Sequence, residues 1–481
     1  MISFCKVTSR PLLLRVLSVA VSVCAWLQPA IAEELREPEI PALQVSGLKP
    51  AGRLAVRNAR DIAASNWSVG CETLDRGFGR YEAYRQFLGA TGAKHIRLQA
   101  GWSRCERNRG TYDFSWLDAV VDDAKVQGVQ PWLELGYGNP LYGGKAGLGS
   151  PIPSQPQESA AWDAWVEATV RHYQSRITTW AIWNEPDLRD ANNEPISFAR
   201  FHCRTAVIVR HIQPDAHLIA LSLSKIHLPW LEALLDASEA AKGIPLFDEV
   251  SYHQYSENPD QRYGQVEELR ALLARRAPHA RVFQGESGAP SKSGGFGALA
   301  KLEWDEVRQA KWNLRRMLGD FSRGIRTNLF TLSDLRYEGN RPNDKGLLEA
   351  RQDLSIIRPK QAWQAARHVF SLLDATWAPL AGSAPSAPGP SWSCFALRRQ
   401  DGVNILAVWR SADPVNDSLT SEPLTLTWSG PAVPLLAVDV RSGQAWELPP
   451  IRPSGSSMLV DAVPGYDSPV LVGPREAFTL R

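Results

Sequence analysis

The sequence has little that is apolar enough, over a sufficient length, for an ordinary membrane span. Its longest apolar run, from Val16 to Leu27, is shorter than the roughly 20 residues that cross a bilayer. Three basic residues precede this run and Ala30-Ile-Ala32 follows it, which is typical of a signal peptide with its cleavage site. We therefore expect residues 1–32 to be removed and the protein to be exported to a periplasmic or extracellular location without membrane insertion. The alternative is retention of this segment as an anchor.

The sequence also lacks an excess of charge of either sign. It contains 53 Lys and Arg residues and 51 Asp and Glu residues. The first 32 residues hold three of the basic residues and no acidic one, which leaves 53 − 3 = 50 against 51. A net charge of about −1 gives no basic field that would attract nucleic acid. An enzyme that acts on a neutral ligand fits this composition better.

Cysteine is scarce, and two of the six cysteines, Cys5 and Cys24, leave with the signal peptide. The spacing of the remaining four matches no zinc site. Tryptophan, in contrast, is abundant, with 18 residues. These side chains either fill a large core or provide flat platforms for sugar rings, and composition alone leaves both interpretations open.

Strand-like apolar runs alternate with helical patterns through most of the chain. This alternation predicts βα units around a parallel sheet, and eight such strands close a (β/α)8 barrel, the TIM barrel of the α/β class. The predicted strands span 66–70, 95–99, 131–135, 178–183, 217–221, 249–253, 281–284 and 327–332. The predicted helices span 81–88, 116–125, 160–173, 196–209, 228–237, 265–275, 306–318 and 359–373.

A different pattern follows a stretch rich in Pro, Gly and Ser at 381–390, which we interpret as a linker or long loop. Beyond it only short alternating runs occur, which predict a small β-sandwich domain. The predicted organisation is a signal peptide at 1–32, an N-terminal extension at 33–60, the barrel at 61–374 and the sandwich at 375–481.

Two glutamates follow predicted strands at the end of the barrel where active sites form. Glu185 ends the fourth strand within Trp180-Ala-Ile-Trp-Asn-Glu-Pro186, and Glu286 ends the seventh within Val282-Phe-Gln-Gly-Glu-Ser-Gly288. A single Glu there would most simply be an exposed loop residue. Two carboxyl groups that face each other across a glycosidic bond can instead act as proton donor and nucleophile. The pair therefore predicts glycoside cleavage.

Asn184-Glu185-Pro186 resembles the most specific motif of a clan of (β/α)8 retaining glycoside hydrolases, which carry the acid/base on strand four and the nucleophile on strand seven. The segment 101–117, with its Glu, Gly and Tyr-Asp-Phe, is similar to the stretch after strand two in that clan. The resemblance covers about residues 61–374 and is nearest to family 39, which includes β-xylosidases, iduronidases and exopolysaccharide hydrolases. It implies that Glu185 is the acid/base, Glu286 the nucleophile and Asn184 a ligand of the neighbouring sugar hydroxyl.

Further candidate site residues lie at other strand ends. Arg97 in the second strand could keep the nucleophile ionised by lowering its pKa, or could form a structural salt bridge inside the barrel. His253 and Tyr255 share one face of the sixth strand, and the resemblance implies that they contact the nucleophile or the sugar. The alternative for His253 is a hydrogen-bonded core residue. Phe330 stands where many clan members have a Trp, and it can still stack on a sugar.

The other candidate sugar-binding residues come from loops near the predicted rim. A third carboxylate, Glu134, lies between two leucines in the third strand, and we interpret it as a paired structural residue. The candidates for sugar contact are Trp102, Tyr137, Asn139, Glu72 and Asp75.

These residues predict a secreted retaining hydrolase that cleaves O-glycosidic bonds of an oligo- or polysaccharide by double displacement. The two carboxyl groups should then lie roughly 5 Å apart, and the reaction needs no metal or organic cofactor. A transglycosylase with the same residues and a carbohydrate-binding barrel without catalysis are the alternatives. The sugar, the linkage and the oligomeric state stay open.

Cys71 and Cys105 follow neighbouring predicted strands and would lie side by side at the barrel rim. Adjacent strands are about 4.8 Å apart, which is within the range that a disulfide accepts. Export to an oxidising compartment makes the bond available. We expect this disulfide, and the alternative is two buried free thiols.

Overall fold

The computed structural model describes residue 1 and residues 38–241, 246–380, 388–455 and 457–481. The predicted signal peptide at 1–32 and the greater part of the predicted linker at 381–390 lie outside these residues. The chain divides into residues 1–36 and a compact unit of residues 37–481, to which all described helices and strands belong. No helix in the described part is both long and apolar enough to cross a bilayer.

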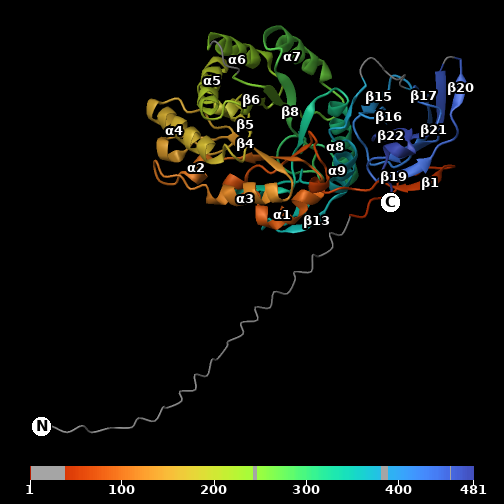
Figure 1. Cartoon of the computed structure of the whole chain (residues 1–481), viewed down its shortest axis with the longest axis horizontal. Coiled ribbons are helices and arrows are strands. Elements are labelled where there is room, and N and C mark those ends of the chain that lie inside the picture. The colour runs from red at the N-terminus through yellow and green to blue at the C-terminus, as the bar shows by residue number, and fades with distance from the viewer. Residues whose placement is uncertain (2–37, 242–245, 381–387, 456) are drawn as a thin grey trace. The chain divides into compact units, whose positions relative to one another are not determined.

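Eight parallel strands close into a barrel in the order β2 to β9, surrounded by helices (Figure 1). This closed barrel confirms the predicted fold, and each predicted strand overlaps one of the observed strands. The barrel strands are β2 Ser68–Gly70, β3 His95–Gln99, β4 Gln130–Leu135, β5 Thr179–Ile182, β6 His217–Leu223, β7 Glu249–His253, β8 Arg281–Ser287 and β9 Arg326–Leu329.

Every predicted helix also has an observed counterpart, whereas α2 was not predicted because four residues carry no helical period. The α-helices are α1 Tyr81–Leu88, α2 Trp102–Cys105, α3 Ser115–Val126, α4 Pro156–Tyr173, α5 Pro195–Ile212, α6 Leu228–Ala240, α7 Tyr263–Arg276, α8 Glu306–Phe321 and α9 Gln361–Leu372. Short 3-10 turns are η1 Ala59–Asp61, η2 Leu74–Arg76, η3 Gly89–Thr91, η4 Pro140–Tyr142, η5 Arg189–Ala191, η6 Glu338–Asn340 and η7 Arg475–Ala477.

Local chemistry explains where several helices begin. Proline occupies the first position of α4 and of α5 and the second position of α6. The backbone N–H groups at these positions have no partner within the helix, so proline, which lacks this group, costs no hydrogen bond there. Asp305 caps α8, because its side chain accepts a 2.9 Å hydrogen bond from the Arg308 amide. These signals place the helix starts close to the predicted positions.

The C-terminal region folds into antiparallel sheets, which confirms the predicted β-sandwich domain. One sheet of seven strands has the order β1 Lys49–Arg53, β19 Gln444–Glu447, β18 Leu435–Asp439, β22 Val470–Pro474, β16 Asn404–Arg410, β15 Trp392–Arg399 and β14 Trp377–Pro379. The other has the order β17 Glu422–Trp428, β21 Ser457–Gly465 and β20 Arg452–Ser454. Because β1 pairs with β19, part of the N-terminal extension completes the C-terminal sheet.

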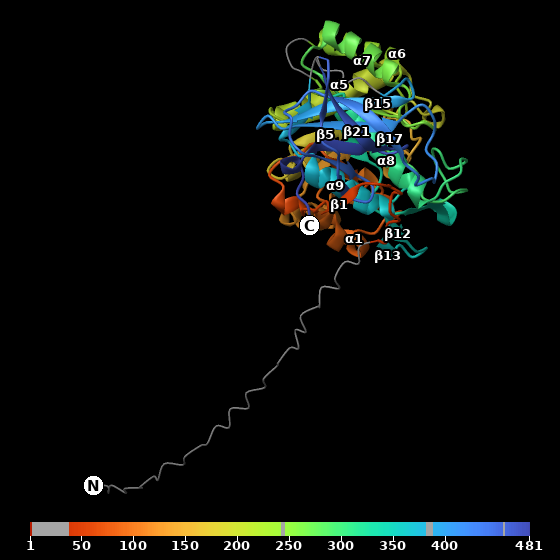
Figure 2. The same ribbon diagram turned by 90° about the vertical axis from the view of Figure 1, so that its right-hand side faces the viewer.

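Helices α8 and α9 of the barrel pack against this domain, as Figure 2 shows behind β15, β17 and β21. Lys311 of α8 donates to the Asp467 carboxylate. Arg315, also in α8, donates at 2.6 Å to Asp260, which accepts a second hydrogen bond of 2.8 Å from the Trp409 indole. The two domains are therefore joined by buried charged and polar contacts as well as by apolar packing.

Two small hairpins lie in the long connection between β9 and α9. They consist of β10 Leu335–Tyr337 with β11 Arg341–Asn343, and of β12 Leu348–Ala350 with β13 Ile356–Pro359. This connection follows the eighth barrel strand, so it extends over the carboxyl end of the barrel, where the loops of such folds form active sites.

The structure overturns the predicted disulfide, because Cys71 and Cys105 are both free and buried. The Cys105 thiol instead donates to the Ala100 carbonyl at 3.2 Å. The Cys71 thiol interacts with Tyr84 of α1, and burial raises its pKa above the ordinary range. The two thiols therefore have different partners, Ala100 for Cys105 and Tyr84 for Cys71.

Candidate active site

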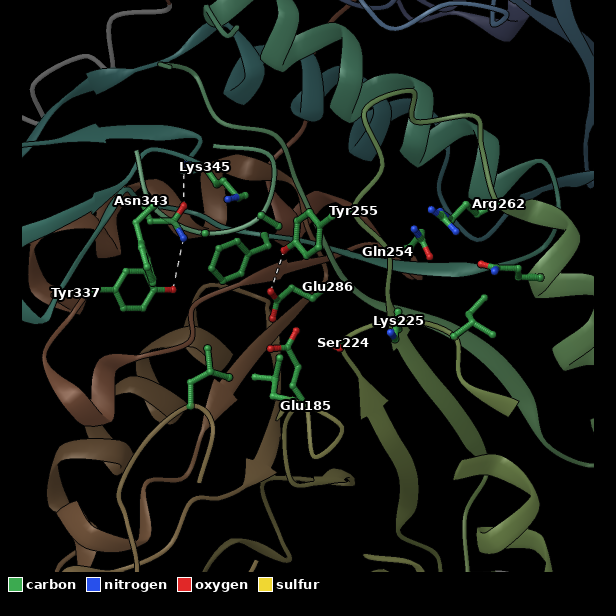
Figure 3. Close-up of a pocket in the computed structure, with 18 residues that line it drawn as sticks. Glu185, Ser224, Lys225, Gln254, Tyr255, Arg262, Glu286, Tyr337, Asn343 and Lys345 are labelled. Atoms are coloured by element: carbon green, nitrogen blue, oxygen red, sulfur yellow. Dashed lines mark hydrogen bonds between the residues drawn. The ribbon is translucent and has the colours of Figure 1, made fainter. Parts of the chain in front are cut away.

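Glu185 and Glu286 face each other at the carboxyl end of the barrel, from the segments that follow β5 and end β8. Oxygens of their carboxyl groups lie within 4.8 Å of each other. Both line a pocket of about 610 Å³, together with residues from the loops after β6, β7 and β9 (Figure 3). A pocket of this volume with converging carboxylates is of the size that binds small molecules or sugar units.

The backbone around both glutamates is specialised. Glu185 has a φ of 47°, in the left-handed region that non-glycine residues rarely adopt, and its amide donates at 2.8 Å to the Ser222 carbonyl. Such outliers persist where the surroundings hold them and concentrate at functional sites. Next to Glu286, Gly285 is required because a Cβ there would collide with Ser251 Oγ.

Glu286 is surrounded by donors and positive charge. Arg97 donates at 2.7 Å to Oε2, and the Tyr255 hydroxyl donates at 2.8 Å to Oε1. His253, which pairs with Glu286 across β7 and β8, has its Nδ1 3.7 Å from Oε2. Burial alone would raise the pKa of Glu286, but the charges of His253 and Arg97 and these hydrogen bonds lower it below its usual range. Glu286 is thus the carboxylate that stays ionised.

The pKa of Glu185 is shifted in the direction opposite to that of Glu286. Glu185 Oε1 lies 2.8 Å from Nδ1 of His253. Burial raises the pKa of Glu185 above its usual range, and the negative charge of Glu286 adds to this effect, while His253 opposes it. Two carboxyl groups whose pKa values are shifted in opposite directions can serve as acid and as nucleophile at the same pH.

Arg97 forms the centre of a buried polar network beneath the pocket. Only 1% of its surface is exposed, and it donates to Glu134 at 2.6 Å and to Glu72 at 3.2 Å as well as to Glu286. Burial raises the pKa of Glu72 to about 7. Because Glu72 can therefore hold a proton near neutral pH, Arg97 and His253 suffice to offset the charges of Glu134 and Glu286.

The same network orients Asn184. Its side-chain oxygen accepts a hydrogen bond from Arg97, and its Nδ2 donates to the Tyr137 hydroxyl at 2.7 Å. Asn184 is only 5% exposed, so two partners hold its amide in one orientation beside Glu185. Tyr137 is itself 3% exposed and acts on the site through Asn184.

Several predicted contacts of the sugar have structural roles instead. Trp102 is fully buried, stacks on Tyr142 and donates at 2.6 Å to Glu106. Asn139 is 1% exposed and caps η4 by accepting from the Leu141 amide. Neither side chain reaches the pocket. The sequence places Trp102 and Asn139 near the barrel rim, but it does not show that the chain turns their side chains inward.

The two loop carboxylates proposed as subsite residues also lie away from the pocket lining. Glu72 is 3% exposed and accepts hydrogen bonds from Arg97 and Asn328 inside the barrel. Asp75 pairs with Arg76 at 3.3 Å. In contrast, Tyr255 and Phe330 line the pocket, and their contact with a sugar stays a prediction.

Sequence reasoning missed several lining residues, all of which lie in the connections that follow barrel strands. The connection after β9 contributes Tyr337, Asn343 and Lys345, and the loops after β6 and β7 contribute Lys225 and Arg262 (Figure 3). No pattern within these connections identifies these residues from the sequence.

Glu185, His253 and Glu286 could offer one ligand atom each to a cation, since these atoms lie within 4.8 Å of one another. The surroundings disfavour a metal ion there. Arg97 already contacts Glu286 at 2.7 Å, and a second cation would lie close to this fixed positive charge. A metal would also remove both carboxyl groups from proton transfer. The donor set therefore fits acid and nucleophile roles better than metal binding.

Comparisons with known proteins agree with this geometry. Residues 98–277 match the model of Glycosyl hydrolases family 39. No curated protein matches the chain significantly.

Several solved structures share the fold. A family 39 glycoside hydrolase from Bacteroides cellulosilyticus WH2 aligns with a TM-score of 0.65 at 17% identity, covering 85% of this chain and 81% of that one. A monomeric β-xylosidase from Caulobacter crescentus CB15 aligns with a TM-score of 0.56 at 17% identity, covering 88% and 98%. A family 30 endoxylanase from Clostridium papyrosolvens C71 aligns with a TM-score of 0.58 at 10% identity, covering 89% and 99%.

At these identities the structural neighbours show a shared fold, whereas the family model matches the segment that carries Asn184, Glu185 and His253. Both findings agree with the resemblance predicted from sequence. The chain is a glycosidase of the (β/α)8 glycoside hydrolase clan, and family 39 is the family whose model it matches.

Proposed function

We propose that this glycosidase is exported and acts with retention of configuration, with Glu286 as nucleophile and Glu185 as acid/base. The observation that carries the proposal is the pair of carboxyl groups within 4.8 Å, the pKa of one raised and that of the other lowered. Retaining enzymes place their carboxyl groups about 5 to 5.5 Å apart, whereas inverting enzymes leave a wider gap for water. The segment at 1–32 supports export.

In the first step, Glu286 attacks the anomeric carbon and the glycosidic C–O bond breaks. Glu185 gives its proton to the departing oxygen, so that a neutral alcohol leaves and a glycosyl ester forms on Glu286. Arg97 and Tyr255 hold Glu286 in position for this attack. The lowered pKa of Glu286 keeps it ionised, and the raised pKa of Glu185 keeps it protonated.

In the second step, Glu185 removes a proton from a water molecule that attacks the same carbon and releases Glu286. His253 can contact Glu185 in both steps, because its protonated Nδ1 can donate to the carbonyl oxygen of the carboxylic acid as well as to the carboxylate. Asn184, fixed by Arg97 and Tyr137, offers its amide to the hydroxyl beside the reacting carbon. Two inversions give net retention.

The experiment follows the configuration of the first product by proton NMR during hydrolysis of an aryl glycoside. We expect the starting configuration, and accumulation of the opposite anomer would overturn the proposed mechanism.

The variant Glu286→Gly tests the nucleophile directly. Its turnover should nearly vanish, and azide should restore cleavage to a glycosyl azide of inverted configuration, because the anion can occupy the vacated space beside Arg97 and Tyr255. Glu286→Gln, which leaves no such space, is the matched control and should not be rescued. Near-normal rates for Glu286→Gly without azide would exclude Glu286 as the nucleophile.

A further inference from the structure

The charges that line the site pocket are unevenly distributed. Apart from the two catalytic carboxyl groups, every charged lining residue is a cation: Lys225, Arg262 and Lys345. In Figure 3, Lys225 and Arg262 lie on one side of the carboxyl pair, and Lys345 lies with Asn343 and Tyr337 on the other. A ligand in this pocket therefore meets positive charge on both sides.

Lys345 is the most informative of the three, because it is only 1% exposed. In the described part of the chain, its ammonium group has neither a hydrogen bond nor an ion pair. The Lys345 Nζ atom lies over the Tyr255 ring, 5.7 Å from the ring centroid. Its backbone is fixed, since its amide donates to Asn343 and its carbonyl accepts from Gln309. Lysine side chains buried to this extent are nearly always paired, and among the described residues the one open direction for Lys345 is the pocket that it lines.

Charge compensation of Glu286 does not account for this arrangement. Glu286 already has Arg97 at 2.7 Å and His253 at 3.7 Å, and no ion pair joins it to Lys345 among the described residues. Burial lowers the pKa of Lys345 to about 8, although Glu286 opposes the shift. The group is therefore still mostly protonated at neutral pH, and because it lines the pocket, an anionic group of a ligand there can pair with it.

We propose that Lys345 binds a negatively charged substituent, a carboxylate or a sulfate, on the sugar in this pocket, so that the substrates of this enzyme are acidic glycans. This inference rests on the proposed glycosidase function and specifies the substrate class of the same site. The ammonium would form a charge-assisted hydrogen bond with the anionic group, which is stronger than a bond to a neutral hydroxyl.

A second pocket extends the cationic surface. It has a volume of about 490 Å³ and shares Leu148, Leu188, Phe296 and Tyr337 with the site pocket. Four of its lining residues are cations and two are acidic. The cations are Arg76, Lys145, Arg189 and Arg341. A chain of acidic sugars could therefore continue from the catalytic site into this neighbouring pocket.

The test compares acidic polysaccharides with their carboxyl-reduced or desulfated forms, and aryl uronides with the matching neutral aryl glycosides. Wild type should cleave an acidic member of these pairs with the higher kcat/KM. Lys345→Met should lose about 10- to 100-fold on that acidic substrate, as expected for one hydrogen bond to a charged group, and less than about threefold on the neutral partner. Separate uronate and sulfate series show which anion is recognised.

Two controls separate the possible outcomes. Lys301→Met removes an exposed cation outside the pocket and should leave the preference unchanged. Calorimetric binding of the same glycans to Glu286→Gln measures charge discrimination without turnover. If no glycan is cleaved but acidic ones bind more tightly through Lys345, the proposed function of Glu286 and Glu185 fails and the anion site stands. Equal use of neutral and acidic partners, or equal losses on both in Lys345→Met, would overturn the inference.

Discussion

His253 should control the pH range of activity, because it lies between the two catalytic carboxyl groups. Its Nδ1 is 2.8 Å from Glu185 and 3.7 Å from Glu286, and the ring is completely buried. Burial lowers the pKa of His253, but the negative charge of Glu286 and the contact with Glu185 raise it above its usual range overall. In its charged form it lowers the pKa of both carboxyl groups.

The size of the effect follows from the longer of these distances. Two unit charges 3.7 Å apart interact by about 4.5 kcal/mol at an effective dielectric constant of about 20, which is equivalent to roughly three pH units. This is an upper bound, since it assumes a full charge on the ring. We therefore expect His253→Asn to raise the pKa of Glu286 by about one to three units.

The direction of the change in the pH profile follows from the role of each group. The nucleophile must be ionised, so a higher pKa of Glu286 moves the acidic limb of kcat/KM upward. The acid must be protonated, so a higher pKa of Glu185 moves the alkaline limb upward as well. Asn can still donate to Glu185, so we expect His253→Asn to move the alkaline limb less than His253→Ala, which removes that donor too.

The assay is the pH dependence of kcat/KM on an aryl glycoside with an activated leaving group, for wild type, His253→Asn and His253→Ala. Thermal unfolding of each variant shows which losses of activity come from unfolding. If the acidic limb of His253→Asn stayed where it is in wild type, His253 would not carry charge in the free enzyme and the electrostatic argument would be refuted.

Two further predictions address the acid and the contact between the domains. Glu185→Ala should lose about 10²- to 10⁴-fold on glycosides with poor leaving groups and little on activated phenyl glycosides, because only the former need a proton as the bond breaks; equal losses on both would indicate a binding role. Asp260→Asn should lower the free energy of unfolding in urea by about 3 to 5 kcal/mol, since Arg315 would be left buried without its charged partner. The control Asp417→Asn breaks an exposed pair with Arg308 and should cost less than about 1 kcal/mol; similar losses for both would contradict this.

The barrel could be predicted from the sequence because its strands are short apolar runs that alternate with amphipathic helices. Ile96 and Leu98 in β3 are both completely or almost completely buried, as are Leu133 and Leu135 in β4. Helices cover the outside of a barrel, so apolar residues recur along its strands even where polar residues such as Arg97 and Glu134 alternate with them. The placement of Glu185 and Glu286 follows from the same pattern, because polar residues just beyond such strands lie at the rim.

The other lining residues, and the inward turn of Trp102 and Asn139, could not be predicted, because they depend on how loops fold over the rim. Trp102 and Asn139 directly follow strands in sequence but turn inward and bond to Glu106. Lys345 lies 16 residues beyond the end of β9 at Leu329 (345 − 329 = 16) and reaches the pocket only because the connection returns over the barrel. Such a return is determined by long-range packing, which leaves no local period in the sequence.

The sequence left two roles open for Arg97, a structural salt bridge inside the barrel and a contact that keeps the nucleophile ionised. The side chain makes contacts of both kinds. A guanidinium has five N–H donors in a rigid plane, so it can hold several carboxylates at once. Two of its contacts, to Glu72 and Glu134, lie within the barrel, and one reaches Glu286 in the pocket. Any change in the barrel interior that displaced Arg97 would therefore alter the charge state of the nucleophile. Structure and catalysis depend on the same ion pairs here, so removal of Arg97 would affect both together.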